Sequence, residues 1–168
     1  MLLPVTLDLA QKSKAVTVIS RHAREFPWAP EGVLHHERLD YRDEGMLRDV
    51  LDAVVEERGP FDLVVVWVHE TAPGAPLVIA EYVGMGGRYV HVLGSDAANP
   101  AHLERSLRLK MQKFMQMTYQ EVILGFVLVG NGARWLRNGE ISEGVLGAID
   151  SRVLRTVVGV VEPWEKRP

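Results

Sequence analysis

The segment 62–68 constrains the fold of this chain more than any other. It reads Asp-Leu-Val-Val-Val-Trp-Val, so apolar side chains follow one another without alternation. A strand of this kind is buried on both faces, which is typical of a parallel sheet covered by helices on both sides. The sequence therefore predicts an α/β protein with segment 62–68 at the centre of its sheet.

The rest of the chain alternates between strand and helix patterns. Strands that are separated by helices pair in parallel through right-handed crossovers. The 168 residues suit one compact unit, so we expect a single three-layer domain with helices on both faces of the sheet. The expected strands are 15–20, 33–39, 62–68, 88–93, 121–129 and 156–161, and the expected helices are 5–12, 43–58, 71–83, 99–111 and 141–149.

The composition limits the partners of the protein. With 19 basic and 22 acidic residues the net charge is −3, and no basic run is long enough to follow a nucleic acid backbone. The sequence also shows no secretory leader and no apolar run that approaches the roughly 20 residues of a membrane span. We therefore expect a cytoplasmic protein that binds neither nucleic acid nor membrane.

Cysteine and histidine usage bears on metal binding and redox chemistry. The chain has no cysteine, so a disulfide, a thiolate metal site and a cysteine nucleophile are excluded. Its six histidines are scattered without ligand spacing, and the adjacent His35 and His36 must point to opposite faces of their predicted strand. We expect no metal site.

Ligands of such folds bind beyond the carboxyl ends of the strands, so residues at those ends are considered first. The segment 130–132, Gly-Asn-Gly, follows a predicted strand and suggests the start of a dinucleotide-binding loop. Trp135, however, occupies the position of the third glycine of that motif. We interpret segment 130–132 as a polar turn.

Several segments at the strand ends resemble the short-chain dehydrogenase/reductase superfamily. They are Ser20-Arg21, segment 39–43 (Leu-Asp-Tyr-Arg-Asp), the central strand and Gly94-Ser95. The resemblance covers nearly the whole chain and implies a Rossmann-like fold and NAD(P)-dependent oxidoreductase chemistry. The segments most similar to a small bacterial group of divergent members are 61–73, 91–95, 119–126, 134–136 and 162–168.

The resemblance also indicates that the first strand is missing. In the family, a strand and a glycine-rich loop precede the first helix, and Met1-Leu2 resembles the last two residues of that loop. A misplaced start codon and a real deletion both explain such an N-terminally truncated domain. Since the missing strand would lie between segments 15–20 and 62–68, we expect these strands to close on each other, or a second copy to fill the gap in a homo-oligomer.

Four residues match the cofactor site of the family. Ser20 and Arg21 stand where the family selects its cofactor, and an arginine there suits the 2′-phosphate of NADP, with NAD as the alternative. Asp40 matches the aspartate that bonds the adenine amino group, with Tyr41 beside it. An exposed strand-end arginine and a turn carboxylate are the simpler interpretations, and both stay open. Without the glycine loop, cofactor binding should be weak or absent.

The catalytic tyrosine and lysine of the family are missing, because none of the four tyrosines is followed by a lysine four positions later. Ser95 matches the family serine by its place after a strand, and Arg108 stands near the expected position of the tyrosine. His69, after the central strand, is the best substitute acid or base, and Tyr119 could assist it. The alternatives are a strand-end hydroxyl for Ser95, a structural imidazole for His69 and an ordinary strand position for Tyr119.

Two functions therefore remain open at the level of sequence. The first is a divergent short-chain reductase with an unknown small-molecule substrate and an altered catalytic set, which Arg21 and Asp40 favour. The second is a non-catalytic nucleotide-binding or structural relative, which the missing Tyr-x-x-x-Lys pair favours. Whether the protein is an enzyme is left undecided by these residues.

Overall fold

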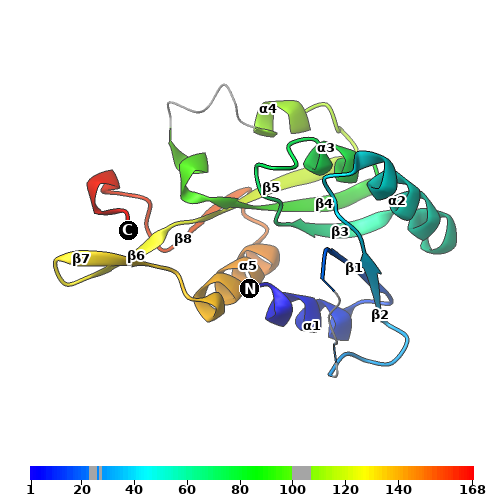
Figure 1. Ribbon diagram of the computed structural model, residues 1–168, viewed down its shortest axis with the longest axis horizontal. Helices are drawn as coiled ribbons and strands as arrows, with labels where there is room; N and C mark the ends of the chain where they lie inside the picture. Colours follow the sequence, from blue (N-terminus) through cyan, green and yellow to red (C-terminus); the bar gives the residue numbers. More distant parts are fainter. Residues whose placement is uncertain (23–25, 27, 100–106) are drawn as a thin grey trace.

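The fold was obtained as a computed structural model of the chain, and it describes residues 1–22, 26, 28–99 and 107–168. Its main sheet has four strands in the order β3-β4-β5-β8, and every neighbouring pair is parallel (Figure 1). The segment expected at the centre of the sheet, 62–68, forms instead the edge strand β3. The four strands are β3 (Phe61–Val66), β4 (Val83–Gly94), β5 (Met117–Leu124) and β8 (Arg155–Val158).

The first two strands form a sheet of their own. Strands β1 (Val16–Ser20) and β2 (Leu34–Arg38) pair in parallel, and within the described residues β1 has no ladder to β3. Of the two alternatives expected, closure of β1 on β3 is therefore wrong, and filling of the gap by a second copy stays a prediction. The helix α2 (Glu44–Arg58) holds β1 instead, because Ile19 packs on its buried face and Arg58 donates to Thr17 Oγ1 at 3.4 Å.

Helices cover both faces of the main sheet, as the alternating pattern predicts. In Figure 1, α1 and α5 lie below the sheet, and α2, α3 and α4 lie above it. The lower layer buries Val5, Val122 and Val145 in one apolar cluster, and the upper layer buries Tyr89 and Met111 in another. The three-layer, Rossmann-like α/β architecture is thereby confirmed. The helices not yet delimited are α1 (Leu3–Lys12), α3 (Ala75–Ala80), α4 (Leu107–Met111) and α5 (Asn138–Ser151).

Local chemistry explains where the helix α2 begins and ends. The Asp43 carboxylate accepts a hydrogen bond from Met46 N at 3.0 Å and so caps the first turn. Gly59 ends the helix with a φ of 83°, a conformation that costs glycine little. The opening predicted at Asn99-Pro100 for the helix before β5 lies partly outside the described residues, which resume at Leu107.

Gly125 divides the strand expected over 121–129. A Cβ at this position would lie 2.1 Å from the Val160 carbonyl oxygen, so only glycine permits the close approach. The chain then continues as β6 (Phe126–Val129), which pairs antiparallel with β7 (Gly132–Trp135) in a projecting hairpin (Figure 1). The polar turn predicted at 130–132 connects these strands, with Gly130 at a φ of 55°.

The chain ends in a short 3-10 turn, η3 (Trp164–Lys166). The next residue, Arg167, forms an ion pair with Asp96, and its guanidinium carbon lies 5.4 Å from the ring centroid of Trp135. The C-terminal tail thus contacts the loop after β4. In the part of the chain that the structure covers, no helix combines the length and the apolar character needed to cross a bilayer.

Candidate functional site

The carboxyl ends of β1 and β2 bring the four predicted cofactor residues into one corner. Ser20 ends β1, and its carbonyl oxygen accepts from Leu39 N at 3.2 Å, which places Asp40 and Tyr41 directly beyond the same edge. The Arg21 guanidinium carbon lies 5.9 Å from the ring centroid of Tyr41. We call Ser20, Arg21, Asp40 and Tyr41 the nucleotide corner.

Asp40 is the electrostatic centre of this corner. Hydrogen bonds from Arg42, with a smaller contribution from the charge of Arg21, lower the pKa of Asp40 to about 2. The carboxylate accepts from Arg42 Nε at 2.9 Å and also from the Arg42 backbone at 3.1 Å. Asp40 is therefore ionised at neutral pH, and its oxygens act as acceptors, which an exocyclic amino group requires.

The Ser20 hydroxyl mainly joins the two strands. It lies 2.8 Å from His36 Nε2 and donates to the His22 carbonyl oxygen at 2.9 Å. No cluster of three metal-ligating side chains occurs in residues 1–22, 26, 28–99 and 107–168. The four residues of the corner offer hydrogen bonds, charge and one aromatic ring.

Ser95 lies at the carboxyl end of β4, in the 3-10 turn η1 (Ser95–Ala98). Ser95 is 2% exposed, and within the described residues its hydroxyl has no hydrogen-bond partner. A buried hydroxyl without a partner costs about 1–3 kcal/mol. Arg155 Nη2 donates to the Ala97 carbonyl oxygen at 3.1 Å and holds this turn against β8.

His69 follows the neighbouring strand β3 and is exposed. Its ring contacts the indole of Trp67, with centroids 5.8 Å apart, and its carbonyl oxygen accepts from Ala72 N at 3.0 Å. Because β3 and β4 are parallel neighbours, His69 and Ser95 both follow the same edge of the sheet. The sequence alone indicated this arrangement for both residues.

Tyr119 lies far from that edge. It pairs with Tyr89 in the β4-β5 register, while Gly94 pairs with Leu124 five residues further on. At about 3.3 Å per residue, this separates Tyr119 from the Ser95 end of the strands by about 16 Å. The structure thus brings His69 and Ser95 to one edge and leaves Tyr119 in the amino-terminal half of β5.

The Tyr119 hydroxyl is engaged with a histidine that the sequence did not single out. His91 Nδ1 lies 2.8 Å from the Tyr119 oxygen, and His91 is 1% exposed. Burial lowers the pKa of His91 to about 4 and raises the pKa of Tyr119 above its usual range. Both groups are therefore uncharged at neutral pH, and the pair acts as a buried hydrogen bond.

A buried carboxylate is the second feature that sequence reasoning missed. The side chain of Glu121 on β5 is 6% exposed, and its Oε2 lies 3.5 Å from Arg108 Nη1 and 3.7 Å from Arg155 Nε. The signal was present, since Glu121 opens the otherwise apolar predicted strand 121–129. A charge inside such a strand requires partners, and these come from α4 and β8.

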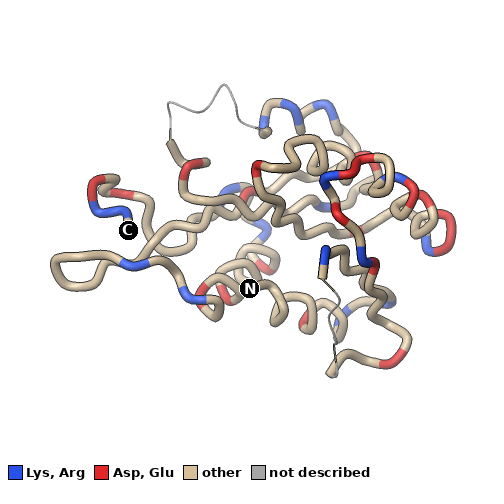
Figure 2. Tube along the Cα trace, in the orientation of Figure 1, with Lys and Arg blue, Asp and Glu red and all other residues tan. Residues whose placement is uncertain are grey.

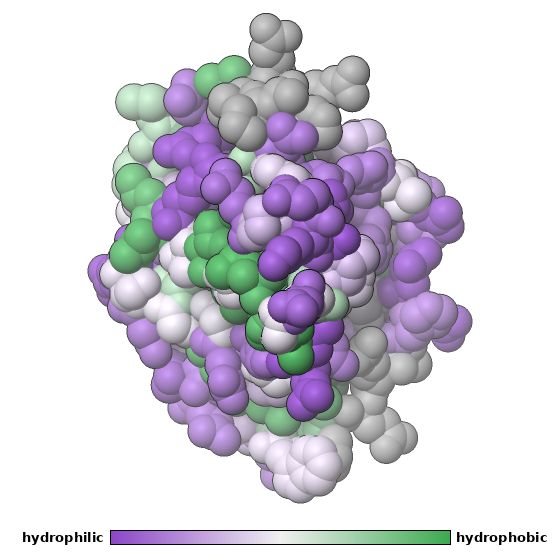
Figure 3. Space-filling model, turned by 90° about the vertical axis from the view of Figure 1, so that its left-hand side faces the viewer, coloured by the Kyte–Doolittle hydropathy of each residue, from purple (hydrophilic) through white to green (hydrophobic). Residues whose placement is uncertain are grey.

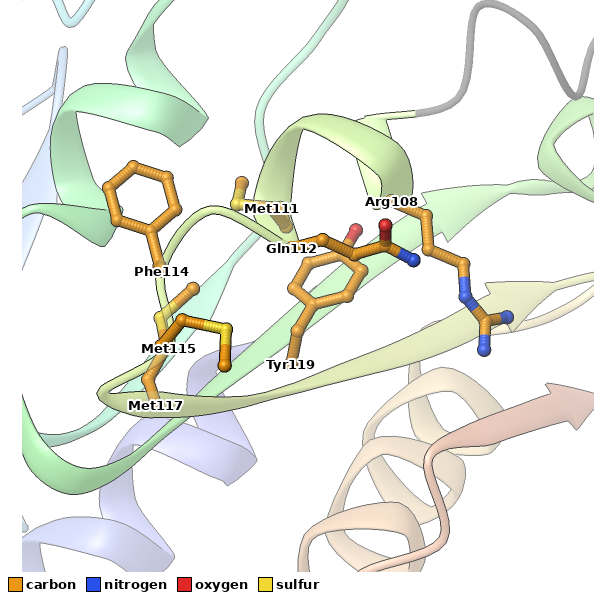
Figure 4. Close-up of a pocket in the computed structure, with 7 residues that line it drawn as sticks. All are labelled: Arg108, Met111, Gln112, Phe114, Met115, Met117 and Tyr119. Atoms are coloured by element: carbon orange, nitrogen blue, oxygen red, sulfur yellow. The ribbon is translucent and has the colours of Figure 1, made fainter.

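A cavity of about 350 Å³ lies between α4 and β5 (Figure 4). Arg108 stands at one end of it. Its other walls combine the amide of Gln112 with methionine and aromatic side chains. The apolar and aromatic residues that line it are Met111, Phe114, Met115, Met117 and Tyr119.

The described residues fit only part of a dinucleotide. The nucleotide corner offers an acceptor, a cation and an aromatic ring, which suit an adenosine group with a phosphate on its ribose. A pyrophosphate is normally cradled by glycines before a helix, yet the first glycine of the sequence is Gly32, beyond α1 and β1. No glycine cradle of this kind therefore precedes α1 in these 168 residues.

No protein-family model and no curated protein matches this sequence. Solved structures do match. A short-chain dehydrogenase/reductase from Serratia marcescens BCRC 10948 is 14% identical, with a TM-score of 0.63 over 95% of this chain and 91% of that chain. One from Mycobacterium marinum is 16% identical, with a TM-score of 0.63 over 94% and 88%. The NADH-dependent reductase A1-R' is 13% identical, with a TM-score of 0.63 over 94% and 89%. At such identities the likeness shows the fold.

Proposed function

We propose that this divergent protein with a short-chain dehydrogenase/reductase-like fold binds the adenosine end of a nicotinamide dinucleotide at the nucleotide corner. The observation that carries the proposal is the convergence of Arg21, Asp40 and Tyr41 beyond two adjacent parallel strands. Two structural neighbours, the reductase A1-R' and a carveol dehydrogenase from Mycobacterium avium, were solved with NAD bound. Their ligand supports the class of cofactor proposed here.

NADP is the preferred form of the cofactor in this proposal. The planar guanidinium of Arg21 matches the geometry of a phosphate, and Tyr41 lies beneath it at 5.9 Å. Arg21 also contributes to the lowered pKa of Asp40, so its positive charge acts at this corner. A guanidinium there suits a ribose 2′-phosphate, whereas NAD carries no group for it.

The same sheet edge provides residues for a reduction. A bound nicotinamide dinucleotide supplies the hydride for a carbonyl group. The Ser95 hydroxyl, which has no partner among the described residues, would orient the carbonyl oxygen, and the His69 imidazolium would donate the proton that this oxygen takes up. Tyr119 lies in the amino-terminal half of β5, where its hydroxyl is hydrogen-bonded to His91 of β4. It would take no direct part in the reduction.

A second function is non-catalytic nucleotide binding. It is favoured by the missing Tyr-x-x-x-Lys pair and by the position of Tyr119, the remaining tyrosine of the catalytic set. Both functions share the nucleotide corner. They differ in whether His69 and Ser95 turn over a carbonyl substrate.

The nucleotide corner is tested with fragments that need no phosphate loop. Calorimetric titration with 2′-AMP and 5′-AMP compares two ligands of equal charge that differ in the place of the phosphate. We expect 2′-AMP to bind more tightly than 5′-AMP. Arg21→Ala should weaken the affinity for 2′-AMP about tenfold, which is a loss of about 1.4 kcal/mol in binding free energy. The matched control is Lys14→Ala, which removes an exposed cation before β1. An unchanged 2′-AMP affinity in Arg21→Ala would disprove the proposal.

Turnover separates the two functions. The absorbance of NADPH is followed in the presence of a panel of aldehydes and ketones, for wild type, His69→Ala and Ser95→Ala. A reductase should consume NADPH in the wild type and lose most of this activity in both variants. Binding of both 2′-AMP and NADPH without any turnover would support the non-catalytic function.

We further propose that the protein is a cytoplasmic homo-oligomer. The β6-β7 hairpin exposes Leu128, Val129 and Trp135, at 43%, 55% and 46% of their surface. Figure 3, viewed from the side on which the hairpin projects, shows an apolar patch among polar residues. Such a patch suits a second copy of the chain. Light scattering of the purified protein should give a mass above 18.8 kDa, and Trp135→Ser should lower it.

A further inference from the structure

The η1 turn that contains Ser95 is fastened at its next two residues. The Arg167 guanidinium donates to both oxygens of the Asp96 carboxylate, from Nη2 to Oδ2 at 3.2 Å. Arg155 of β8 donates to the Ala97 carbonyl oxygen at 3.1 Å. The backbone that follows Ser95 is therefore held by two arginines from the C-terminal part of the chain.

Two tryptophans hold the Arg167 side chain in place. Its guanidinium carbon lies 5.4 Å from the ring centroid of Trp135 on β7 and 5.8 Å from that of Trp164 in η3. A planar guanidinium can contact aromatic rings and still donate two hydrogen bonds to one carboxylate, which a lysine ammonium cannot do. Such a two-pronged ion pair has a defined geometry, unlike most exposed pairs. We call Trp135, Trp164 and Arg167 the tail clamp.

The segments that carry the two tryptophans are themselves anchored. Arg134, next to Trp135, donates two hydrogen bonds of 2.8 Å to the Glu140 carboxylate of α5. Before the tail, Val160 exchanges two backbone hydrogen bonds with Phe126 of β6, at 2.8 and 2.9 Å. In Figure 2 the hairpin and the tail lie at the same end of the molecule, and both carry basic residues, drawn in blue. The tail clamp therefore connects η1 to α5 and to the hairpin.

We propose that Arg167 positions Ser95 for the carbonyl group of the substrate. This role rests on the proposed reductase function, in which the Ser95 hydroxyl orients the carbonyl oxygen. Asp96 directly follows Ser95, so a shift of the Asp96 backbone moves Ser95 as well. A misplacement of about 1 Å at a reacting group can lower a rate about a hundredfold. Arg167 acts through Asp96 and is thus a positioning residue.

The test compares turnover with nucleotide binding in Arg167→Ala. The consumption of NADPH with the aldehyde or ketone that the wild type reduces fastest gives kcat, and calorimetric titration with 2′-AMP measures the nucleotide corner. We expect Arg167→Ala to lower kcat about tenfold. It should bind 2′-AMP as the wild type does, because the corner belongs to the separate β1-β2 sheet. Lys166→Ala, which removes the exposed neighbouring cation, is the matched control and should keep the wild-type kcat.

A free cation separates positioning from damage to the fold. Millimolar guanidinium chloride, far below denaturing concentrations, should restore part of the kcat of Arg167→Ala, because the ion fits between the two indoles and the Asp96 carboxylate. The kcat of the wild type and of Lys166→Ala should not change. Hydrogen exchange gives a readout besides activity: the Asn99 amide, bonded to the Asp96 carbonyl oxygen at 3.0 Å, should exchange faster in Arg167→Ala.

The positioning role and the reductase function fail in different ways. If the wild type consumes NADPH and Arg167→Ala has the same kcat, the positioning role alone is overturned. A parallel loss of kcat and 2′-AMP affinity would overturn it as well, since the whole fold would then be disturbed. A wild type that binds 2′-AMP and NADPH but reduces no carbonyl would overturn the reductase function and the role of Arg167 together.

Discussion

The two parallel sheets of this protein differ in how completely they are buried. In the main sheet, β4 and β5 pair over eight consecutive residues, and Tyr89, Val90 and Ile123 have no exposed surface. In the β1-β2 sheet, no residue of either strand is fully buried. Both regions contain β-branched residues typical of strands, at 16–19 in β1 and at 122–123 in β5. The difference shows that a strand pattern sets the local conformation, whereas neighbouring strands and helices set the burial.

A matched pair of isoleucine substitutions tests this difference in burial most directly. Ile123→Ala on β5 should reduce the free energy of unfolding by about 2–5 kcal/mol, since it leaves a cavity in a fully buried strand. Ile19→Ala on β1 should cost clearly less, because its side chain is only partly buried. Urea denaturation of both variants measures the two costs. Equal costs would mean that β1 is as well covered in solution as β5.

The two regions should also respond to pH in different ranges. The folded-state pKa of His91 is about 4, below its ordinary value of 6.5, so the unfolded chain takes up a proton that the folded chain does not. Stability should therefore fall as the pH drops from about 6.5 to about 4, by about 3 kcal/mol at roughly 1.4 kcal/mol per pKa unit.

Thermal melts across this pH range measure the effect. His91→Gln should flatten the dependence, while His22→Gln, a change at an exposed site near β1, should leave it intact. Asp40 in the nucleotide corner, whose pKa is lowered to about 2, contributes stability above pH 3.8 that is lost only as the pH falls toward 2. If the melting temperature of His91→Gln depended on pH as steeply as that of the wild type, His91 would not be the group responsible.

The loss of a polar contact should also reduce the free energy of unfolding more in the main sheet than in the β1-β2 sheet, although by less than the isoleucine substitution. Gln120 accepts from Arg88 Nε at 3.1 Å and donates to the Val153 carbonyl oxygen at 2.8 Å. Gln120→Leu leaves these partners unpaired and should cost about 1–3 kcal/mol. Ser20→Ala in β1 should cost at most about 1 kcal/mol, because that site is open to water. Chemical denaturation would contradict this order if Ser20→Ala lowered the free energy of unfolding more than Gln120→Leu does.

The smallest effect on stability is expected at Asp40. Its ion pair with Arg42 is exposed to solvent, and such pairs add little to folding stability. Asp40→Asn should leave the melting temperature unchanged and weaken the binding of 2′-AMP, which contains the adenine amino group. Unchanged affinity would assign Asp40 to the turn alone, which was the simpler interpretation of the sequence.

Much of the fold could be predicted from the sequence, because its strands and helices are short segments with clear periodicity. The α2 helix with its Asp43 cap and Gly59 end was predicted correctly. The break at Gly125 was not, since it depends on the approach of Val160, 35 positions away in the chain. The edge position of β3 likewise depends on which strands pair with it.

The candidate site shows the same division. Ser20, Arg21, Asp40 and Tyr41 were expected together and do meet, because the ends of adjacent parallel strands coincide. Tyr119 was grouped with Ser95, but the register separates them by about five residues, or about 16 Å. Register follows from tertiary packing, and the strand pattern of Tyr119 contains no information about it.

The sequence by itself determined the α/β class, the placement of most strands and helices and the lack of a Tyr-x-x-x-Lys pair, and it predicted that Ser20, Arg21, Asp40 and Tyr41 lie together. These are properties of neighbouring residues and of residue types. The division of the parallel strands into two sheets, the buried His91-Tyr119 bond and the charge cluster around Glu121 were decided only by the tertiary structure. They depend on distances between segments far apart in the chain, and only packing determines such distances.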